Sequence, residues 1–502
     1  MNKKKIILFL GIFIAVFSCI ICKTIGNLDE LWNYNTARVI SNGMIPYKDV
    51  SMITTPFLPF ITGIIFKVFT SELLVSRVIA SFVWTGIFYL TYEILNTAIN
   101  KKKFCFIILG LMYYICKDYI CIDYNVLILF ETIIIIYLEI QKNLKQNKND
   151  LYNIIIGFTG GIAFCTKQSI GILIIVCLLG INLLELLLKK DKKKFLKSVL
   201  YKFVGVIIPI IVFFIYLFLM NSINDFINYA ILGIKTFSNS VSYLELFLYE
   251  KIKLDILAIF MPIMLIYSIY FFICNSFVSK KNDKESICVS TTFLYSLPLL
   301  FFMYPIADDI HFTLGIYVLF IEAMFLVFQF IKYLYQFIKV RYKKKVLLFI
   351  ETFLTVFTLL LIVGNAALNY KNYICSDKTV GINHYKFIPI QEYLSKRINK
   401  IDEYIIQKQK EGKKVYILDA EAVVYNIPLD IYNKDYDMFL IGNIGKDGQE
   451  GQIEKIKNKE EELYLIKNRK LEQNWQTPLE VVNYIRDNLE YVEDISIYEV
   501  YK

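Results

Sequence analysis

The sequence predicts an α-helical polytopic membrane protein with a small α/β domain at its C-terminal end. Three observations support this: a very apolar composition, apolar segments that alternate with lysine-rich loops, and a more polar composition after about residue 368. Of the 502 residues, 56% are hydrophobic and 16% are aromatic, and the mean hydropathy is +0.50. A soluble chain of this size would expose much of that apolar surface to water, so we expect the bilayer to be the solvent for most of it.

The apolar segments predict about eleven membrane spans. They are residues 6–25, 76–96, 104–116, 120–140, 151–165, 170–188, 199–220, 254–277, 288–304, 312–337 and 346–368. The first segment is expected to be a retained span rather than a signal peptide, because no small-residue cleavage site precedes Lys23. Two segments, 104–116 and 151–165, are short for a hydrocarbon core of about 30 Å.

Lysine-rich loops alternate with the other loops and indicate the orientation of the chain. They contain residues 3–5, 101–103, 142–148, 189–197, 280–284 and 339–345. Short loops rich in Lys and Arg stay on the cytoplasmic side, so the N-terminus is expected inside and the C-terminal domain outside the cell membrane. The net charge of +10 is explained by these loops, and no basic groove with interleaved aromatic residues is evident. Nucleic acid is therefore not an expected partner. The ten cysteines lie mostly in apolar segments and predict no disulfide framework.

The first outer loop, residues 26–75, is too long and too apolar for a plain connector. The spacing of its residues after Asp29, up to Asn42 and Gly43, predicts a short helix with an acidic start. Residues 55–69 are apolar and predict an interfacial helix in the headgroup region.

Residues 369–502 predict the α/β domain, because expected strands and helices alternate there. The strands are expected at 414–418, 438–441, 462–466 and 495–500, and the helices at 387–410 and 478–489, the first of them stopped by Gly412. The glycine-rich stretch 442–451 predicts a mobile loop.

Three polar clusters are expected on the outer face: Asp29 with Glu30, Lys167 between two spans, and Asp308 with His311 in a late loop. Each has a structural alternative. The two acids can stabilise a helix start, the lysine can extend toward the headgroups, and the late loop can be a polar turn. Together, however, carboxylates, a lysine and a histidine are the groups that proton removal and stabilisation of a leaving phosphate require.

The first loop resembles that of polyprenyl-phosphate-dependent membrane glycosyltransferases with the C-type fold (GT-C, family 39), which include protein mannosyltransferases and lipid A aminoarabinose transferases. The matching residues are Asp29, Glu30, Tyr34, Ala37, Gly43, Pro46, Tyr47, Asp49, Thr55 and Pro56. The chain departs from the pattern at Thr55-Pro56, where many members have two prolines. The run from Gly160 through Lys167 to Gly171, and the spacing Pro305, Asp308 and His311, also resemble segments of these enzymes.

The resemblance implies a GT-C-like transmembrane catalytic domain over 1–368, which transfers a sugar from a polyprenyl-phosphate donor to a glycan, lipid or protein of the cell envelope. Asp29 is the first candidate for the base, Glu30 is its rival, and Asp49 assists or, together with Asp29, holds a divalent cation. Lys167 and His311, the latter oriented by Asp308, are expected to contact the donor phosphate. Further candidates are Arg38 and Lys48 for phosphate, and Tyr34 and Tyr47 around the site.

Other polar residues receive structural interpretations. Lys117, Asp118, Asp123 and Tyr124 are interpreted as a solvated outer turn, and His384 as a surface residue. Two other functions stay open: a transporter or flippase of lipid-linked sugars, and a non-catalytic envelope sensor. Charges that gather at the outer ends of the spans, and the absence of a visible repeat, favour the enzyme over the transporter.

Overall fold

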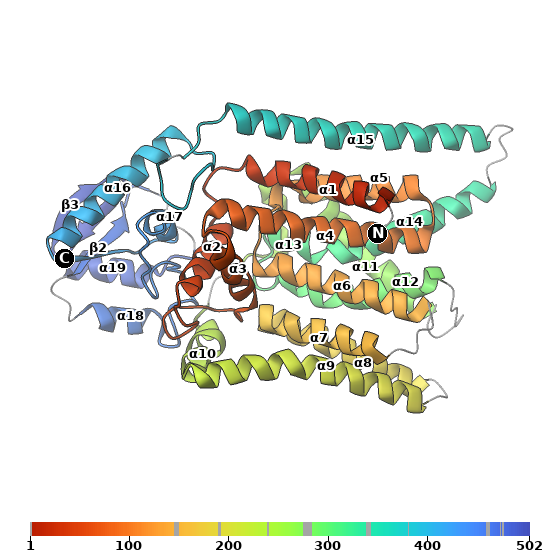
Figure 1. Ribbon diagram of the computed structural model, residues 1–502, viewed down its shortest axis with the longest axis horizontal. Coiled ribbons are helices and arrows are strands. Elements are labelled where there is room, and N and C mark those ends of the chain that lie inside the picture. The colour runs from red at the N-terminus through yellow and green to blue at the C-terminus, as the bar shows by residue number, and fades with distance from the viewer. Residues whose placement is uncertain are drawn as a thin grey trace.

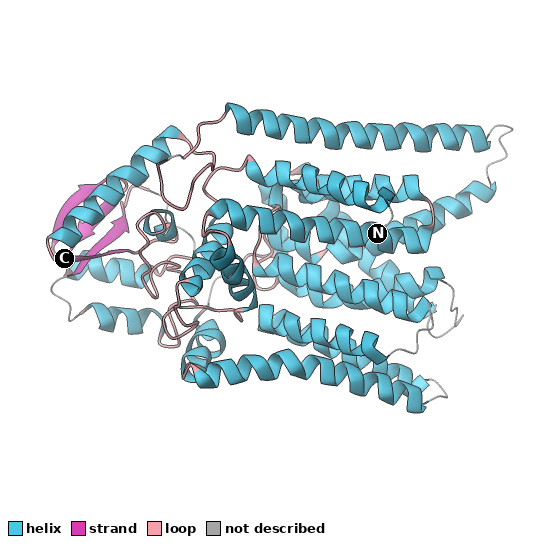
Figure 2. Ribbon diagram, viewed as in Figure 1, coloured by secondary structure: helices cyan, strands magenta, loops and turns pink. Residues whose placement is uncertain are grey.

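Long helices form a bundle that carries a smaller, sheet-containing unit at one end (Figures 1 and 2). The computed structural model describes residues 3–144, 150–188, 192–237, 240–274, 284–337, 343–379, 381–457, 462–471, 473 and 476–502. Parts of four predicted lysine-rich loops (145–148, 189–191, 280–283 and 339–342), and the end of the predicted span 254–277, lie outside these residues.

Each predicted span corresponds to a helix. The helices are α1 (Lys3–Ile21), α4 (Leu73–Ile99), α5 (Lys102–Cys116), α6 (Tyr124–Leu144), α7 (Asp150–Thr166), α8 (Gln168–Leu188), α9 (Lys192–Leu219), α11 (Ile252–Ile273), α12 (Lys284–Leu300), α14 (Tyr317–Phe337) and α15 (Lys343–Cys375). Among the described residues, eight helices are long and apolar enough to cross a membrane. The polytopic helical fold is thereby confirmed. The predicted span 312–337 is divided, because a short helix, α13 (Asp309–Gly315), precedes α14.

Glycines bring α7 and α9 into close contact. A Cβ atom on Gly157 would lie 2.0 Å from the carbonyl oxygen of Lys202, and one on Gly205 would lie 2.2 Å from that of Ile154. Small residues at helix crossings allow this approach inside a membrane. The short helix α7 is thus packed directly against its neighbour.

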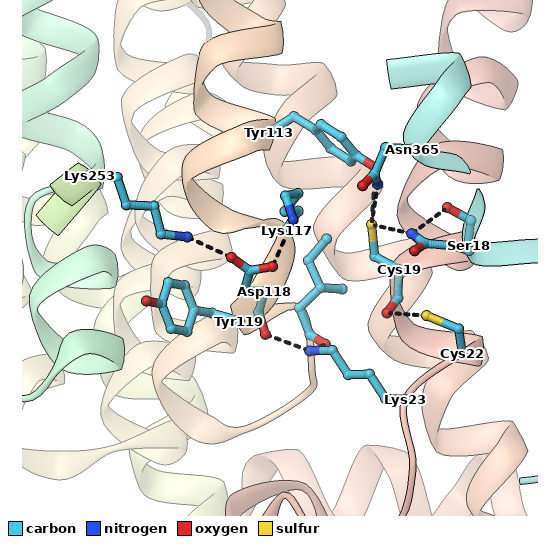
Figure 3. Close-up of polar contacts among 12 residues, drawn as sticks. Ser18, Cys19, Cys22, Lys23, Tyr113, Lys117, Asp118, Tyr119, Lys253 and Asn365 are labelled. Carbon is cyan, nitrogen blue, oxygen red and sulfur yellow. Dashed lines mark hydrogen bonds and ion pairs between the residues drawn. The ribbon is translucent and has the colours of Figure 1, made fainter. Parts of the chain in front are cut away.

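Helix α15 lies at the edge of the bundle and packs against α1 and α5 (Figure 1). Asn365 of α15 donates a hydrogen bond to the hydroxyl of Tyr113 at 2.8 Å, and that hydroxyl lies 3.0 Å from the sulfur of Cys19 (Figure 3). Polar contacts of this kind stabilise helix association where the hydrophobic effect is weak.

Helices α2 (Leu28–Ser41) and α3 (Phe57–Val68) lie between the bundle and the sheet unit (Figure 1). Asn27 caps α2 by accepting a hydrogen bond from the amide of Glu30 at 3.1 Å. Gly43 ends the helix with a positive φ of 101°, as a glycine after a helix does. The predicted first-loop helix and the helix expected within 55–69 both exist.

The sheet unit contains four described strands in the order β1-β2-β4-β3. Strand β1 (Lys414–Ile417) runs parallel to β2 (Glu462–Lys467), while β4 (Tyr498–Tyr501) is antiparallel to both β2 and β3 (Tyr491–Ile495). The accompanying helices are α16 (Glu392–Lys410), α17 (Ala422–Asn426), α18 (Gly448–Ile456) and α19 (Leu479–Asn488).

Three predictions for this unit are wrong. Residues 438–441 form a turn instead of a strand. The strand predicted at 495–500 is a hairpin, because Ser496 adopts a positive φ of 57° and reverses the chain. The stretch 442–451, predicted as a mobile loop, is ordered at its end as the start of α18, where Gln452 donates to the carbonyl of Ile444 at 3.1 Å.

The sheet unit docks on α2 through polar contacts. Trp32 donates to the carbonyl of Ala420 at 3.2 Å, Asn35 donates to Asp437 at 2.9 Å, and Arg38 pairs with Asp430 at 2.8 Å. His384 is buried here, with its ring nitrogens 3.0 Å from the Ser71 carbonyl and 2.7 Å from Asp430. It is a docking residue, and its prediction as a surface residue is wrong.

Candidate active site

Asp29 and Glu30 begin α2 but face different partners. Glu30 accepts two hydrogen bonds from the guanidinium of Arg77 on α4, at 3.0 and 2.9 Å, and both side chains are buried. Arg77 also donates to the carbonyl of Lys23 at 2.6 Å, which ties α2 to the end of α1. A carboxylate held in this way has little freedom to accept a substrate proton.

Asp29 belongs to a group of charged side chains from four parts of the chain, called here the central polar cluster: Asp29, Asp123, Lys167, Asp308 and His311. Burial is the main reason why the pKa of Asp29 rises to about 6. The charges of Asp123 and Asp308 raise it further, while the charge of Lys167 opposes the rise. A carboxyl group with such a pKa is close to the ideal for accepting a proton near neutral pH.

Asp123 holds the first turn of α6 in place. Its carboxylate accepts hydrogen bonds from the amides of Asn125 and Val126, at 2.6 and 2.9 Å, and its side chain is 2% exposed. It was interpreted as a solvated interface charge, which is wrong. The carboxylate lies before the first turn of a helix, and that N-cap position was the available signal, but the predicted span from residue 120 ran through it.

Lys167 lies at the turn between α7 and α8. Its ammonium donates to Oδ1 of Asn125 at 2.7 Å and lies over the rings of Tyr124 and Phe302, at 5.0 and 5.4 Å from their centres. Burial lowers the pKa of Lys167 to about 8, although the carboxylates of Asp123 and Asp29 counteract the effect. The ammonium therefore remains a cation at neutral pH.

His311 and Asp308 form a local pair at the start of α13. Asp308 accepts hydrogen bonds from the amide and from Nδ1 of His311, both at 2.8 Å. Burial by itself would raise the pKa of Asp308, but the hydrogen bonds from His311 outweigh it and lower the pKa. Asp308 thus stays ionised and orients the ring, in the geometry that the sequence analysis expected.

Several predicted site residues have other partners. The guanidinium of Arg38 donates hydrogen bonds to Asn35, Asp430 and the carbonyl of Ile431. Lys48 is exposed, and its carbonyl accepts a hydrogen bond from Lys434 at 2.6 Å. The placement of both residues differs from the phosphate-binding expectation, because one is bound in the docking contact and the other faces solvent.

Asp49, Tyr34 and Tyr47 also make contacts of their own. Asp49 accepts from the amide of Ile45 at 2.8 Å within its own exposed turn, so it does not join Asp29 in the central polar cluster. Tyr34 donates to the carbonyl of Ser71, and Tyr47 donates to that of Thr54 at 2.8 Å. Both tyrosines are buried, and they pack the first loop.

A second basic group lies at the same end of the bundle, around Asp118 and Tyr119. Lys253 and Lys117 pair with Asp118 at 2.6 and 2.9 Å, and Lys23 donates to its carbonyl at 2.8 Å (Figure 3). Lys251 pairs with Asp309, which also accepts from Tyr119 at 3.1 Å. Lys23, Lys117, Lys251 and Lys253 are called here the lysine group. They outnumber the two carboxylates among them, those of Asp118 and Asp309.

The described residues contain no group of three or more metal-ligating side chains. Asp49 does not complete a pair with Asp29, so the cation site expected from these two residues is not formed. The carboxylates that do interact are those of Asp29, Asp123 and Asp308. The charge of Lys167 acts on Asp29 as well.

Comparisons with known proteins support the fold. No protein-family model matches the sequence, and no curated protein matches it. The structure is similar to the crystal structure of ArnT from Cupriavidus metallidurans bound to undecaprenyl phosphate, with a TM-score of 0.55, 10% identity, and coverage of 100% of this chain and 98% of that one. The archaeal oligosaccharyltransferase AglB from Archaeoglobus fulgidus, in complex with an inhibitory peptide and a dolichol-phosphate, aligns with a TM-score of 0.46 at 12% identity, over 85% of this chain and 64% of AglB. The likeness to ArnT extends over the bundle and the sheet unit alike, and it identifies the fold of this chain as the GT-C membrane fold.

Proposed function

We propose that the protein is a membrane glycosyltransferase that transfers a sugar from a polyprenyl-phosphate donor to an acceptor of the cell envelope, on the extracytoplasmic face. The observation that carries the proposal is the central polar cluster, in which a base with a pKa of about 6 lies among a lysine, a histidine and further carboxylates. The ligand named for ArnT is a polyprenyl phosphate, which agrees with this donor class.

In the proposed reaction, Asp29 accepts the proton of an acceptor hydroxyl or amine as its oxygen or nitrogen bonds to the anomeric carbon. The bond between that carbon and the donor phosphate oxygen breaks, and the electron pair leaves with the lipid phosphate. Lys167 contributes the positive charge that stabilises the leaving phosphate. Asp123 and Glu30 are positioning residues, because they hold the first turns of α6 and α2.

The lysine group is suited to the phosphate of a lipid-linked donor, because it carries excess positive charge where spans α1, α5 and α11 end. Next to Lys117, residues of α5, α13 and α14, including Cys116 and Tyr317, form an apolar surface. A charged headgroup with an apolar chain matches this combination of surfaces.

The transporter remains the alternative, and one observation favours it. Glu131 in α6 and Glu322 in α14 are buried within the bundle, so the charges of the spans are not confined to their outer ends, as the sequence analysis assumed. Buried intramembrane acids are typical of transport paths. In reconstituted vesicles, sugar-lipid flipping without product formation would support this alternative.

The first test is transfer of radiolabelled sugar from polyprenyl-phosphate donors in membranes. We expect Asp29→Asn to reduce the rate by about 100-fold or more, because a positioned general base contributes about 10²–10⁴-fold. Asp49→Asn is the matched control and should leave the rate within about twofold, since Asp49 lies in an exposed turn. Equal rates for native protein and Asp29→Asn would remove Asp29 from the reaction, and no transfer from any donor would contradict the proposal.

A further inference from the structure

Asn125 connects the two nitrogen-bearing members of the central polar cluster. Its Oδ1 accepts the hydrogen bond from Lys167 at 2.7 Å, and its Nδ2 lies 3.5 Å from Nε2 of His311. The side chain is 5% exposed, and its backbone amide is bound by Asp123 at 2.6 Å. The Asn125 side-chain amide therefore turns its oxygen toward Lys167 and its nitrogen toward His311.

The order of hydrogen-bond donors and acceptors from Lys167 through Asn125 to His311 determines which ring nitrogen of His311 carries the proton. An ammonium has only donors, so it requires the oxygen of the Asn125 amide and turns the NH2 group toward His311. The opposite ring nitrogen, Nδ1, lies 2.8 Å from the Asp308 carboxylate and must donate to it. An NH2 group cannot face a second N–H at Nε2. We infer that Asn125 is a positioning residue that holds His311 as the neutral Nδ1–H tautomer, with an unprotonated Nε2.

The charged surroundings make this role necessary. Asp308 at the start of α13 and Asp29 on α2 both favour a doubly protonated, positive His311, while Lys167 between α7 and α8 acts against it through Asn125. Without Asn125, the two carboxylates would favour the imidazolium ion. The amide of Asn125 is the group that tips the balance to the neutral ring.

The role of His311 in the proposed function, on which this inference rests, is thereby changed. The sequence analysis expected His311 to contact the donor phosphate. With Nε2 unprotonated, His311 is instead a proton acceptor before transfer, beside Asp29. The proton that Asp29 accepts would, on passing to Nε2, release Nε2 from Asn125 by repulsion and leave a cation close to the departing phosphate.

The test uses diethyl pyrocarbonate, which acylates unprotonated imidazole nitrogen, on the full-length protein in detergent. The chain has only two histidines, so mass spectrometry of the two peptides follows His311 and uses His384 as an internal reference. Asn125→Asp is isosteric but places an acceptor and a negative charge beside Nε2. We expect the midpoint of the His311 reaction to move upward by about one to three pH units, which is a loss of reactivity of about tenfold per unit below the new midpoint.

Asn125→Ala removes the NH2 group that opposes a proton on Nε2 without adding a negative charge, so the midpoint of the His311 reaction should also move upward, but by less than in Asn125→Asp. An unchanged His384 rate shows that each variant is folded. Identical pH profiles of His311 in the native protein and in Asn125→Asp would overturn the inference. Since this readout needs no donor or acceptor, it is independent of whether the proposed transfer activity is found.

Discussion

At the scale of single residues, the central polar cluster shows how one fold prepares neighbouring groups for different tasks. Asp29 and Glu30 are adjacent in the sequence, yet Glu30 is bound by Arg77 at 2.9 Å while Asp29 has its pKa raised to about 6. Lys167 is shifted in the other direction, to about 8. Burial is the leading cause of both shifts, since it disfavours the charged form of either group.

These two shifts predict the pH dependence of transfer. Asp29 acts in its ionised form, so the rate should fall about tenfold per unit below pH 6, and Lys167 acts as a cation, so the rate should fall in the same way above pH 8. The expected kcat/KM profile is a bell between these values, measured with a saturating acceptor. Lys167→Arg should remove the alkaline limb, because an arginine stays protonated; a limb that persists would assign it to another group.

The lysine group yields a second prediction at this scale. Lys251→Ala combined with Lys253→Ala should raise the KM for the lipid-linked donor by about tenfold or more and change kcat little, because these residues are proposed to bind rather than to react. The effect should weaken with salt, since both side chains are partly exposed. Lys67→Ala, an exposed lysine of α3, is the control for loss of charge alone. A KM that does not change would separate the lysine group from the donor.

At the scale of elements, close packing of helices places the site. Lys167 depends on the turn between α7 and α8, and α7 is held against α9 by glycines that leave no room for a side chain. Helix α2 depends in turn on its cap and on the ion pair with α4. The charged groups therefore have rigid supports on different helices, which a site of this kind needs.

Gly157→Ala tests this packing. Its new methyl group would meet the Lys202 carbonyl at 2.0 Å, so α7 and α9 must separate, and we expect a destabilisation of about 1–3 kcal/mol. Thermal unfolding in detergent measures it as a lower melting temperature. Gly180→Ala is the matched control in α8, because no atom lies within 4 Å of its added Cβ. Equal melting temperatures for both variants would contradict the close contact.

At the scale of the whole molecule, the short helix α2 is one of the elements that join the membrane bundle to the sheet unit. Helix α2 carries Asp29 at its start and the docking residues Trp32, Asn35 and Arg38 farther along. The sheet unit thus supports the element that holds the proposed base. Its contacts with α2 give it a role that its own sequence did not indicate.

Arg38→Leu should loosen this docking. The substitution removes the partner of Asn35 and of the Ile431 carbonyl at a buried position, and of the half-exposed Asp430. Leaving a buried acceptor without its donor costs about 1–3 kcal/mol. We expect faster proteolysis within residues 376–391, between α15 and α16, and a lower transfer rate. Lys48→Ala, at an exposed lysine of the same loop, should change neither. Native-like proteolysis of Arg38→Leu would show that the other contacts suffice.

The sequence alone determined what depends on local pattern. Spans follow from apolar segment length, the α2 helix from its cap and its glycine stop, and the pair of Asp308 and His311 from a spacing of three residues that a helix start brings together. The prediction of one strand at 495–500 from the local pattern is wrong, because Ser496 has a positive φ and the chain there forms the ends of two strands.

Only the tertiary structure decided which of the polar residues share one site. Asp123 seemed to be part of a solvated turn, and Arg38 seemed free to bind phosphate, because nothing in a linear sequence states which distant group a side chain meets. The fold buries Asp123 beside Asp29 and places Asn125 between Lys167 and His311. It also pairs Arg38 with Asp430. Charge, burial and hydrogen bonding act through space, so the roles of these residues depend on the arrangement of the helices that carry them.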